Sequence, residues 1–200
     1  MTEPTSPIPR LILASASPRR QSLLSEAGFE FTVQPADIDE ASFQTPNVSP
    51  SELAVGLAVA KAKAVREKFP QDVVLAADTI VSFGEQILGK PADAKHAIAM
   101  LNLLEGTTHL VITGVAVLAA STSEPKTARI MSAVRMRPLA MEWIQKYVAG
   151  GDWQGKAGGY GIQDEDPLVE RISGCHTNIV GLPMTTTRKM LLEAGILPKK

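Results

Sequence analysis

The chain has 200 residues, of which 44% are hydrophobic and 20% charged, and its formal net charge at pH 7 is −1. This length suits one sizeable α/β domain, and the composition is typical of a globular protein rather than a disordered one. The near-zero charge argues against a nucleic-acid partner or a membrane-surface partner, because such surfaces need a clear basic excess. The single cysteine, Cys175, cannot form an internal disulfide, so a reducing, cytoplasmic location is expected.

The first elements are a polar arm, a short strand and a helix. Residues 1–10 are proline-rich and are expected to form a flexible N-terminal arm, with a single domain over residues 11–197. A short apolar run at 11–15 predicts a strand buried on both faces. Pro18 suits the first turn of a helix, and Gly28 is a stop signal for it.

Strands and helices alternate along the rest of the chain. The pattern first predicts a strand over 29–35, a polar loop over 36–52, and a helix that is capped by Ser49 or Ser51 and ends near Lys68. A strand with a polar interruption over 72–89, a helix over 93–106, and two long adjacent strands over 108–120 and 128–139 follow. The last predicted elements are a helix over 140–153, a glycine-rich loop over 155–166, a strand over 167–172 and a helix over 181–195. This alternation indicates an α/β or α+β domain with one main sheet. The longest apolar run, at 109–121, is too short for a membrane-spanning helix, and the N-terminus lacks the features of a signal peptide.

The first polar cluster lies where the strand at 11–15 ends. It contains Ser15, Ser17, Arg19 and Arg20. Hydroxyls, free N–H groups and a helix N-terminus together suit an anion, and arginine suits the oxygens of a phosphate. The alternative is a capped helix with two solvated arginines.

Three further clusters carry candidate functional groups. Asp78 and Thr79 lie within an apolar run, where a carboxylate is costly to bury without a cation or a metal; the alternative is a residue that caps a strand or turn. Lys90 is held between a glycine and a proline. Lys156 and Gln163 belong to the glycine-rich loop, whose backbone can approach a ligand closely, although a flexible linker is the alternative.

The loop before the second helix adds acidic side chains, and that helix adds lysines. Asp37, Asp39 and Glu40 could share a hard cation such as Mg²⁺ with Asp78, although acidic loops are commonly only solvated. Two lysines in that helix, Lys61 and Lys63, are two residues apart, so we expect at most one to point into a given site. This inventory of cations, carboxylates and glycine-rich backbone suits metal-assisted attack of water on a phosphate chain.

The clusters, taken in order, resemble those of a known family. The segments "LILASASPRRQSLL", "DIDE", "LAVAKAKAV", "AADTIV", "KAGGYGIQ" and "NIVGLPM" follow one another over residues 10–195, as in the Maf nucleotide pyrophosphatases, also called septum-formation-inhibitor-like proteins. The resemblance implies a two-lobed α/β fold similar to the inosine triphosphate pyrophosphatases. In that fold a long mixed central sheet forms an active-site cleft between the lobes.

The resemblance also implies an activity, a cofactor and roles for particular residues. The activity is hydrolysis of a nucleoside triphosphate to the monophosphate and pyrophosphate with a divalent cation, Mg²⁺ or Mn²⁺. Asp78 matches the proton acceptor, and Glu40 and Asp78 are the carboxylates on the metal side. Contacts with the polyphosphate match Ser15, Arg20, Lys61 and Lys90. The positions that separate the subfamilies are Arg19, Thr79 and Gln163, and they look like those of the branch that acts on dTTP and UTP.

One segment departs from the family pattern. After Gln163 the family usually continues with glycine and small residues, whereas this chain has Asp164, Glu165 and Asp166. The leading hypothesis is a house-cleaning pyrophosphatase for dTTP, UTP and modified pyrimidine nucleotides. The acidic run keeps 7-methyl-GTP open as an alternative substrate, and the family's name keeps open a nucleotide-binding regulator of septation. A homodimer is also expected from the resemblance, with the two long apolar strands as either interface or core.

Overall fold

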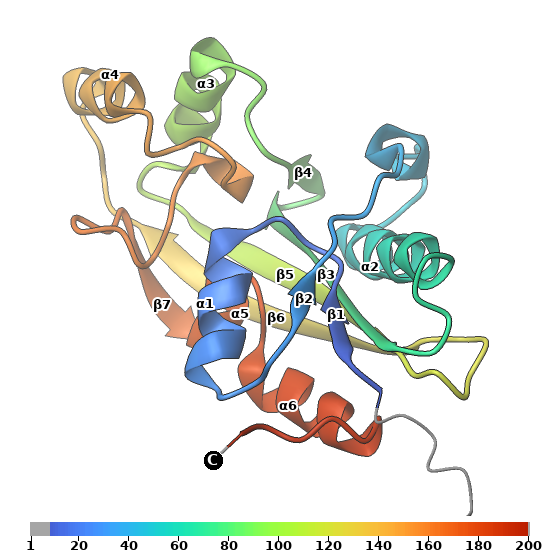
Figure 1. The fold of residues 1–200 in the computed structure, drawn as a ribbon. Coiled ribbons are helices and arrows are strands. Elements are labelled where there is room, and N and C mark those ends of the chain that lie inside the picture. Colours follow the sequence, from blue (N-terminus) through green and yellow to red (C-terminus); the bar gives the residue numbers. More distant parts are fainter. Residues whose placement is uncertain (1–8, 200) are drawn as a thin grey trace, which may run out of the picture.

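A mixed sheet of seven strands organises residues 9–199, the part of the chain that the computed structural model describes (Figure 1). Its strands are β1 (Leu11–Leu13), β2 (Thr32–Val33), β3 (Val73–Phe83), β4 (Gln86–Leu88), β5 (Thr108–Leu118), β6 (Lys126–Met136) and β7 (Val169–Ser173). The order across the sheet is β2-β1-β3-β5-β6-β7, and β4 pairs with β3. Because β1 runs parallel to β2 and β3 while the other pairs are antiparallel, the predicted long mixed sheet is confirmed.

Helices cover both faces of this sheet. They are α1 (Pro18–Glu26), α2 (Pro50–Arg66), α3 (Ala94–Leu104), α4 (Met141–Gly150), α5 (His176–Val180) and α6 (Met184–Glu193), with 3₁₀ turns η1 (Glu40–Phe43) and η2 (Ala157–Gly159). Leu24 of α1 and Leu191 of α6 pack against Leu75 on one face. On the other face, Ala62 of α2 packs against Val74. Apolar residues at alternate positions of β3 therefore serve two different layers of helices.

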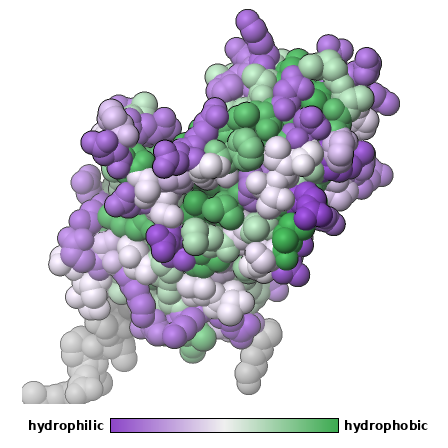
Figure 2. Space-filling view, turned by 180° about the vertical axis from the view of Figure 1, so that it is seen from behind, coloured by the Kyte–Doolittle hydropathy of each residue, from purple (hydrophilic) through white to green (hydrophobic). Residues whose placement is uncertain are grey.

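The far ends of the long strands carry a second lobe. There α3, α4 and η2 enclose a core that includes Leu101, Ile144 and Trp153, together with Val111 of β5 and Val134 of β6. Figure 1 shows α3 and α4 standing apart from α1 and α2, and Figure 2 shows a notch between two lobes at the top of the molecule. The predicted two-lobed arrangement is thus confirmed.

The long strand β3 differs from the expectation in one respect. The polar residues Asp78 and Thr79 do not interrupt it, because both pair with β5, opposite Gly114 and Thr113. Along its other edge β3 pairs with β1 only as far as Leu75 and with β4 only from Val81 onward. The polar pair lies in the gap between these two partners, at a point where ligands commonly bind in open α/β sheets.

Three smaller differences concern the ends and connections. The predicted strand at 29–35 is reduced to the two residues of β2, and α5 was not expected. Ser49, not Ser51, caps α2, in a reciprocal capping box with Glu52. Residues 1–8 of the predicted arm lie outside the described part, and the single domain over 11–197 stays a prediction.

Within residues 9–199, no helix is both long and apolar enough to cross a membrane.

Candidate active site

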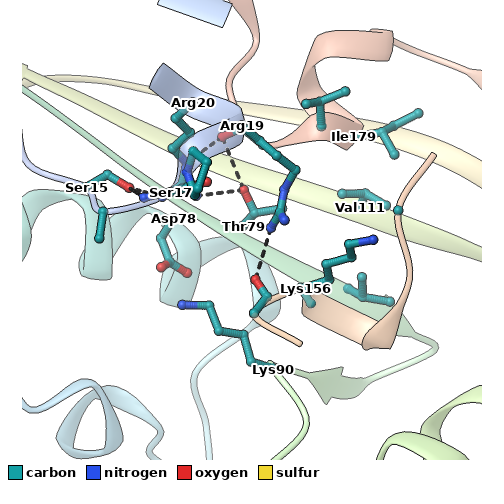
Figure 3. A pocket seen from close by; sticks show the side chains of 18 of the residues that line it. Ser15, Ser17, Arg19, Arg20, Asp78, Thr79, Lys90, Val111, Lys156 and Ile179 are labelled. Carbon is teal, nitrogen blue, oxygen red and sulfur yellow. Dashed lines mark hydrogen bonds between the residues drawn. The ribbon is translucent and has the colours of Figure 1, made fainter. Parts of the chain in front are cut away.

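A cavity of about 520 Å³ opens at the gap in the edge of β3, between the two lobes. It brings together most of the side chains that the sequence nominated for the site: Ser15, Ser17, Arg19, Arg20, Glu40, Lys61, Asp78, Thr79, Lys90, Lys156 and Gln163. Figure 3 shows several of them, among them Arg20, Asp78 and Lys90. Asp37 and Asp39 do not line it. Asp39 instead accepts a hydrogen bond from the Ala41 N–H at the start of η1.

Lys61 joins two carboxylates at the centre of the cavity. Its Nζ lies 2.6 Å from Asp78 Oδ1 and 2.7 Å from Glu40 Oε1. Lys61 and Asp78 are both buried, at 8% and 9% exposure, whereas about half of the Glu40 side chain is exposed. The buried carboxylate therefore has its cation, as its apolar surroundings in the sequence required.

The approach of α2 to the sheet places Lys61 there. A side chain at Gly114 of β5 would put its Cβ 2.3 Å from the carbonyl oxygen of Ala54, so only glycine allows α2 to lie this close. Lys63 points elsewhere and pairs with Glu124 at the surface. The prediction that only one of these two lysines enters the site is confirmed.

The charges around Glu40 determine its ionisation. Burial alone would raise the pKa of Glu40, but the hydrogen bond and charge of Lys61, helped by Lys90 and Arg20, lower the pKa below its ordinary value. Glu40 is therefore an anion at neutral pH.

Arg20 is held by hydrogen bonds from three directions. Its Nε donates to the carbonyl of Gly181 at 2.8 Å, and its two terminal nitrogens donate to Ser15 Oγ and Thr79 Oγ1, each at 3.0 Å. Burial lowers the pKa of Arg20, and the nearby charge of Asp78 opposes that effect. An arginine remains charged under these conditions, so the cavity wall carries a fixed cation.

The hydroxyl of Thr79 belongs to a chain of hydrogen bonds with one direction. Arginine can only donate and a carbonyl can only accept, so the chain runs from Arg20 to Thr79, then to Thr113 and on to the carbonyl of Asn178. Thr113 and Asn178 are fully buried in β5 and α5. The guanidinium of Arg20 is thus anchored through β3 and β5 to the backbone of α5.

The start of α1 is not closed by a side-chain cap. Ser17 has an extended backbone at the N-cap position but makes no capping hydrogen bond, and Pro18 occupies the first turn. The Ser15 hydroxyl accepts from the Ser17 N–H at 3.3 Å as well as from Arg20. The alternative of an ordinary capped helix is therefore wrong, and the N-terminus of α1 lines the cavity.

Arg19, Lys90 and Gln163 occupy the rim between the lobes. Arg19 donates to the Gly155 carbonyl at 3.0 Å and so links α1 to the glycine-rich loop. Lys90 is exposed and extends toward Asp78 in Figure 3. Gln163 is also exposed at the cavity. The structure brings these three into the site, and their individual roles stay predictions.

Sequence reasoning missed the functional place of two residues, one in the cavity wall and one behind it. Tyr160 lines the cavity and His109 lies behind it, with its Nε2 2.6 Å from the Tyr160 hydroxyl. Burial lowers the pKa of His109 to about 4, so the ring is neutral. The signal in the sequence was a histidine at the head of the apolar run of β5, parallel to the signal that singled out Asp78.

The carboxylates fit a divalent cation only in combination with a ligand. Among the described residues, no group of three or more His, Cys, Asp or Glu side chains could hold a metal ion. Glu40 and Asp78 nevertheless lie on either side of one ammonium group, which already occupies a cation position. Mg²⁺ commonly takes one or two carboxylates and completes its shell with water and phosphate oxygens, a requirement that this pair meets.

Comparison with known proteins is consistent with this geometry. The family model described as Maf-like protein matches residues 10–194. A protein of Dehalococcoides mccartyi (strain CBDB1), named dTTP/UTP pyrophosphatase, is 42% identical over 98% of this chain and 87% of its own length. Proteins with the same name from Symbiobacterium thermophilum and Roseobacter denitrificans are each 45% identical, over 93% and 92% of this chain and 94% and 96% of their own lengths. With a match of this extent across both lobes, the chain belongs to the Maf-like protein family.

Proposed function

We propose that this protein hydrolyses dTTP and UTP to the nucleoside monophosphate and pyrophosphate. The observation that carries the proposal is a buried carboxylate, Asp78, on the floor of a cavity whose walls hold more cations than carboxylates. Such a wall suits a polyphosphate, and such a base suits the activation of water. The names of the relatives support this substrate pair.

Asp78 is the proposed proton acceptor. Its Oδ1 accepts from Lys61, and within residues 9–199 its Oδ2 has no hydrogen-bond partner. A water that attacks the α-phosphorus can give its proton to Oδ2 as the new P–O bond forms and the bond to the leaving pyrophosphate breaks. Lys61 holds the carboxylate in place through this transfer.

The proposed phosphate contacts are the four positions Ser15, Arg20, Lys61 and Lys90. Charge develops on the transferring phosphoryl group and on the pyrophosphate that leaves, and fixed cations stabilise it without reorganising. Arg20 is the clearest example, because its three hydrogen bonds hold the guanidinium in one orientation before a substrate binds.

A divalent cation, Mg²⁺ or Mn²⁺, is the proposed cofactor, and Glu40 and Asp78 would hold it together with the polyphosphate. When bound, it would neutralise phosphate charge. Lys61 lies between the two carboxylates in the structure, so the cation would share their oxygens with its ammonium group.

Base selection is proposed to rest on Arg19, Thr79 and Gln163. The neutral amide of Gln163 can both donate to and accept from the edge of a pyrimidine, which favours dTTP and UTP over 7-methyl-GTP. Thr79 would act indirectly, since its hydroxyl is already engaged by Arg20 and Thr113. Arg19 would act at the rim, where it holds the backbone of Gly155.

The proposal is tested by pyrophosphate release from a panel of canonical and modified nucleoside triphosphates, with Mg²⁺, Mn²⁺ or no metal. Asp78→Asn keeps the shape of the side chain but cannot take the proton, so turnover of dTTP and UTP should fall by about 10²–10⁴-fold. Nucleotide binding by the variant should persist. Asp166→Asn neutralises an exposed carboxylate that does not line the cavity, so it is the matched control and should retain activity.

Other outcomes would replace the proposal. Turnover of 7-methyl-GTP in place of dTTP and UTP would assign the chain to the alternative substrate. Binding of nucleotides with no metal-dependent turnover by the unaltered protein would favour a regulator of septation.

A further inference from the structure

The acidic run that departs from the family pattern does not act as one group. Asp166 pairs with Arg137 and is exposed, and Glu165 is exposed with no hydrogen bond or ion pair to any residue in 9–199. Asp164 instead turns inward, with a side-chain exposure of 16%. Asp164 is therefore the one member of the run that packs inward, against the rest of the glycine-rich loop.

The carboxylate of Asp164 collects three donors. Its Oδ1 lies 2.5 Å from Nζ of Lys156, whose side chain is 13% exposed. Its Oδ2 accepts from the Gly161 N–H at 3.0 Å and from the Tyr147 hydroxyl of α4 at 3.2 Å. These contacts tie both ends of the loop that carries Gln163 to the second lobe.

The fit of this carboxylate depends on a glycine. A Cβ at residue 161 would lie 2.5 Å from Asp164 Oδ1, so any side chain there would displace the carboxylate. Burial raises the pKa of the Tyr147 hydroxyl, and the charge of Asp164 raises it further, so Tyr147 stays protonated and donates. The Tyr147 hydroxyl is thus a donor to Asp164, in keeping with the geometry of the contact.

We propose that Asp164 is a positioning residue for base recognition: it fixes the wall of the cavity that carries Gln163 and cancels the charge of Lys156. Lys156, Gly161 and Gln163 all line the cavity, whereas Asp164 supports them from behind. The inference rests on the proposed function, since it assigns the glycine-rich wall to the base of the nucleotide.

The Lys156–Asp164 ion pair also affects where a phosphate can bind in the cavity. Lys156 is paired with Asp164, so among the described residues only Arg19, which already donates to the Gly155 carbonyl, lacks a carboxylate partner at the loop end of the cavity. Arg20 has only neutral hydrogen-bond partners, and Lys90 has no ion pair within the described residues. The polyphosphate is therefore drawn to the end beside Asp78, which leaves the base at the Lys156–Asp164 end.

Asp164→Asn tests the inference directly. Asparagine has no charge and one accepting oxygen in place of two, so it cannot balance Lys156 or accept from Lys156 on one side and from Gly161 and Tyr147 on the other. The loop therefore loses part of its tie. We expect KM for UTP to rise about tenfold with kcat changed by less than about threefold, and the preference for UTP over CTP to fall. Inhibition by inorganic pyrophosphate should become stronger, because Lys156 is released as a phosphate-binding cation.

Glu165→Gln is the matched control, since it removes the same charge from the neighbouring exposed residue. The double variant Lys156→Gln/Asp164→Asn separates the two effects. It should return pyrophosphate inhibition to the level of the unaltered protein while KM for UTP stays high. Equal KM, base preference and pyrophosphate inhibition in Asp164→Asn and Glu165→Gln would overturn the inference.

A measurement without turnover keeps this inference separate from the proposed function. Amide hydrogen exchange over residues 156–163 should be faster in Asp164→Asn than in the unaltered protein and unchanged in Glu165→Gln. Unchanged exchange in Asp164→Asn would disprove the tie even if the enzyme is active. Absence of dTTP and UTP turnover in the unaltered protein would instead refute the proposed function and, with it, the assignment of this wall to the base.

Discussion

At the scale of single residues, the buried His109 links the pH response of the fold to the cavity. The ring is 2% exposed, and its only hydrogen bond within the described residues goes to Tyr160, a wall residue. Burial lowers the pKa of His109 from 6.5 to about 4. Protonation of the ring is therefore resisted in the folded protein and free in the unfolded chain.

We predict that His109 makes the protein less stable in mild acid. Because its pKa is depressed in the folded state, its contribution is fully present above pH 6.5 and is lost as the pH falls toward about 4. The loss in the free energy of unfolding should reach up to about 3 kcal/mol. Urea unfolding of the unaltered protein and of His109→Gln between pH 7.5 and 4 measures it, and parallel pH curves would exclude the effect.

The chemistry at this scale was largely predictable from the sequence, but the supporting residues were not. Asp78 and Lys90 were conspicuous because a carboxylate in an apolar run and a lysine between glycine and proline are unusual settings. Thr113 gave no such signal, and nothing in the sequence linked His109 to the site, because the hydrogen bonds of both side chains go to residues distant in the chain. A pattern within one segment cannot reveal partners that only the assembled sheet brings together.

At the scale of elements, four segments cooperate to hold one guanidinium. Arg20 comes from α1, Thr79 from β3, Thr113 from β5, and the final acceptor is the carbonyl of Asn178 in α5. Sequence periodicity predicted α1 and the strands, whereas α5 is only five residues long and was missed. The shortest of these four elements, which lacks a periodic signal, thus ends the chain of hydrogen bonds.

Replacing Thr113 by valine should weaken this support without changing the shape of the core. The Asn178 carbonyl would lose its donor, and Thr79 would turn toward the Gly181 carbonyl, 3.4 Å away. We expect about 1 kcal/mol less stability and a rise in KM for UTP as Arg20 loosens, while Thr113→Ser should behave like the unaltered protein. Steady-state kinetics with thermal unfolding of both variants tests this, and equal KM values would argue against it.

At the scale of the whole molecule, charge is distributed unevenly. The net charge is −1, yet the cavity wall holds more cations than carboxylates. Composition could exclude a broadly basic surface but could not locate these cations, because they come from α1, α2 and loops of both lobes. Only the fold gathers them around one cavity.

This local excess predicts a rate that depends on salt. Raising KCl from about 0.1 M to about 1 M shortens the screening length from about 10 Å to about 3 Å. We therefore expect kcat/KM for UTP to fall several-fold while kcat at saturating substrate changes little, because the fixed contacts in the cavity are screened less than the approach from solvent. Initial rates at several KCl concentrations check this, and a constant kcat/KM would contradict it.

The outer surface bears on the predicted homodimer, which stays a prediction. Figure 2 shows apolar patches among polar side chains on the back of the molecule. Leu110 of β5 and Met131 of β6 are 38% and 48% exposed, whereas the middle of β5 is buried as core. Sedimentation equilibrium of the full chain would measure the oligomeric state.

The two faces of β3 determine whether the site tolerates an odd number of inserted or deleted residues in this strand. Asp78 faces Lys61 of α2 and its neighbour Thr79 faces Arg20 of α1, because successive side chains point to opposite faces. Deleting one residue between Val73 and Asp78 would exchange the two faces and present the hydroxyl to the lysine and the carboxylate to the arginine. The number of residues between Leu75, where the pairing with β1 ends, and Asp78 can therefore change only in steps of two. Homologous sequences should accordingly contain no single-residue insertions or deletions in this segment.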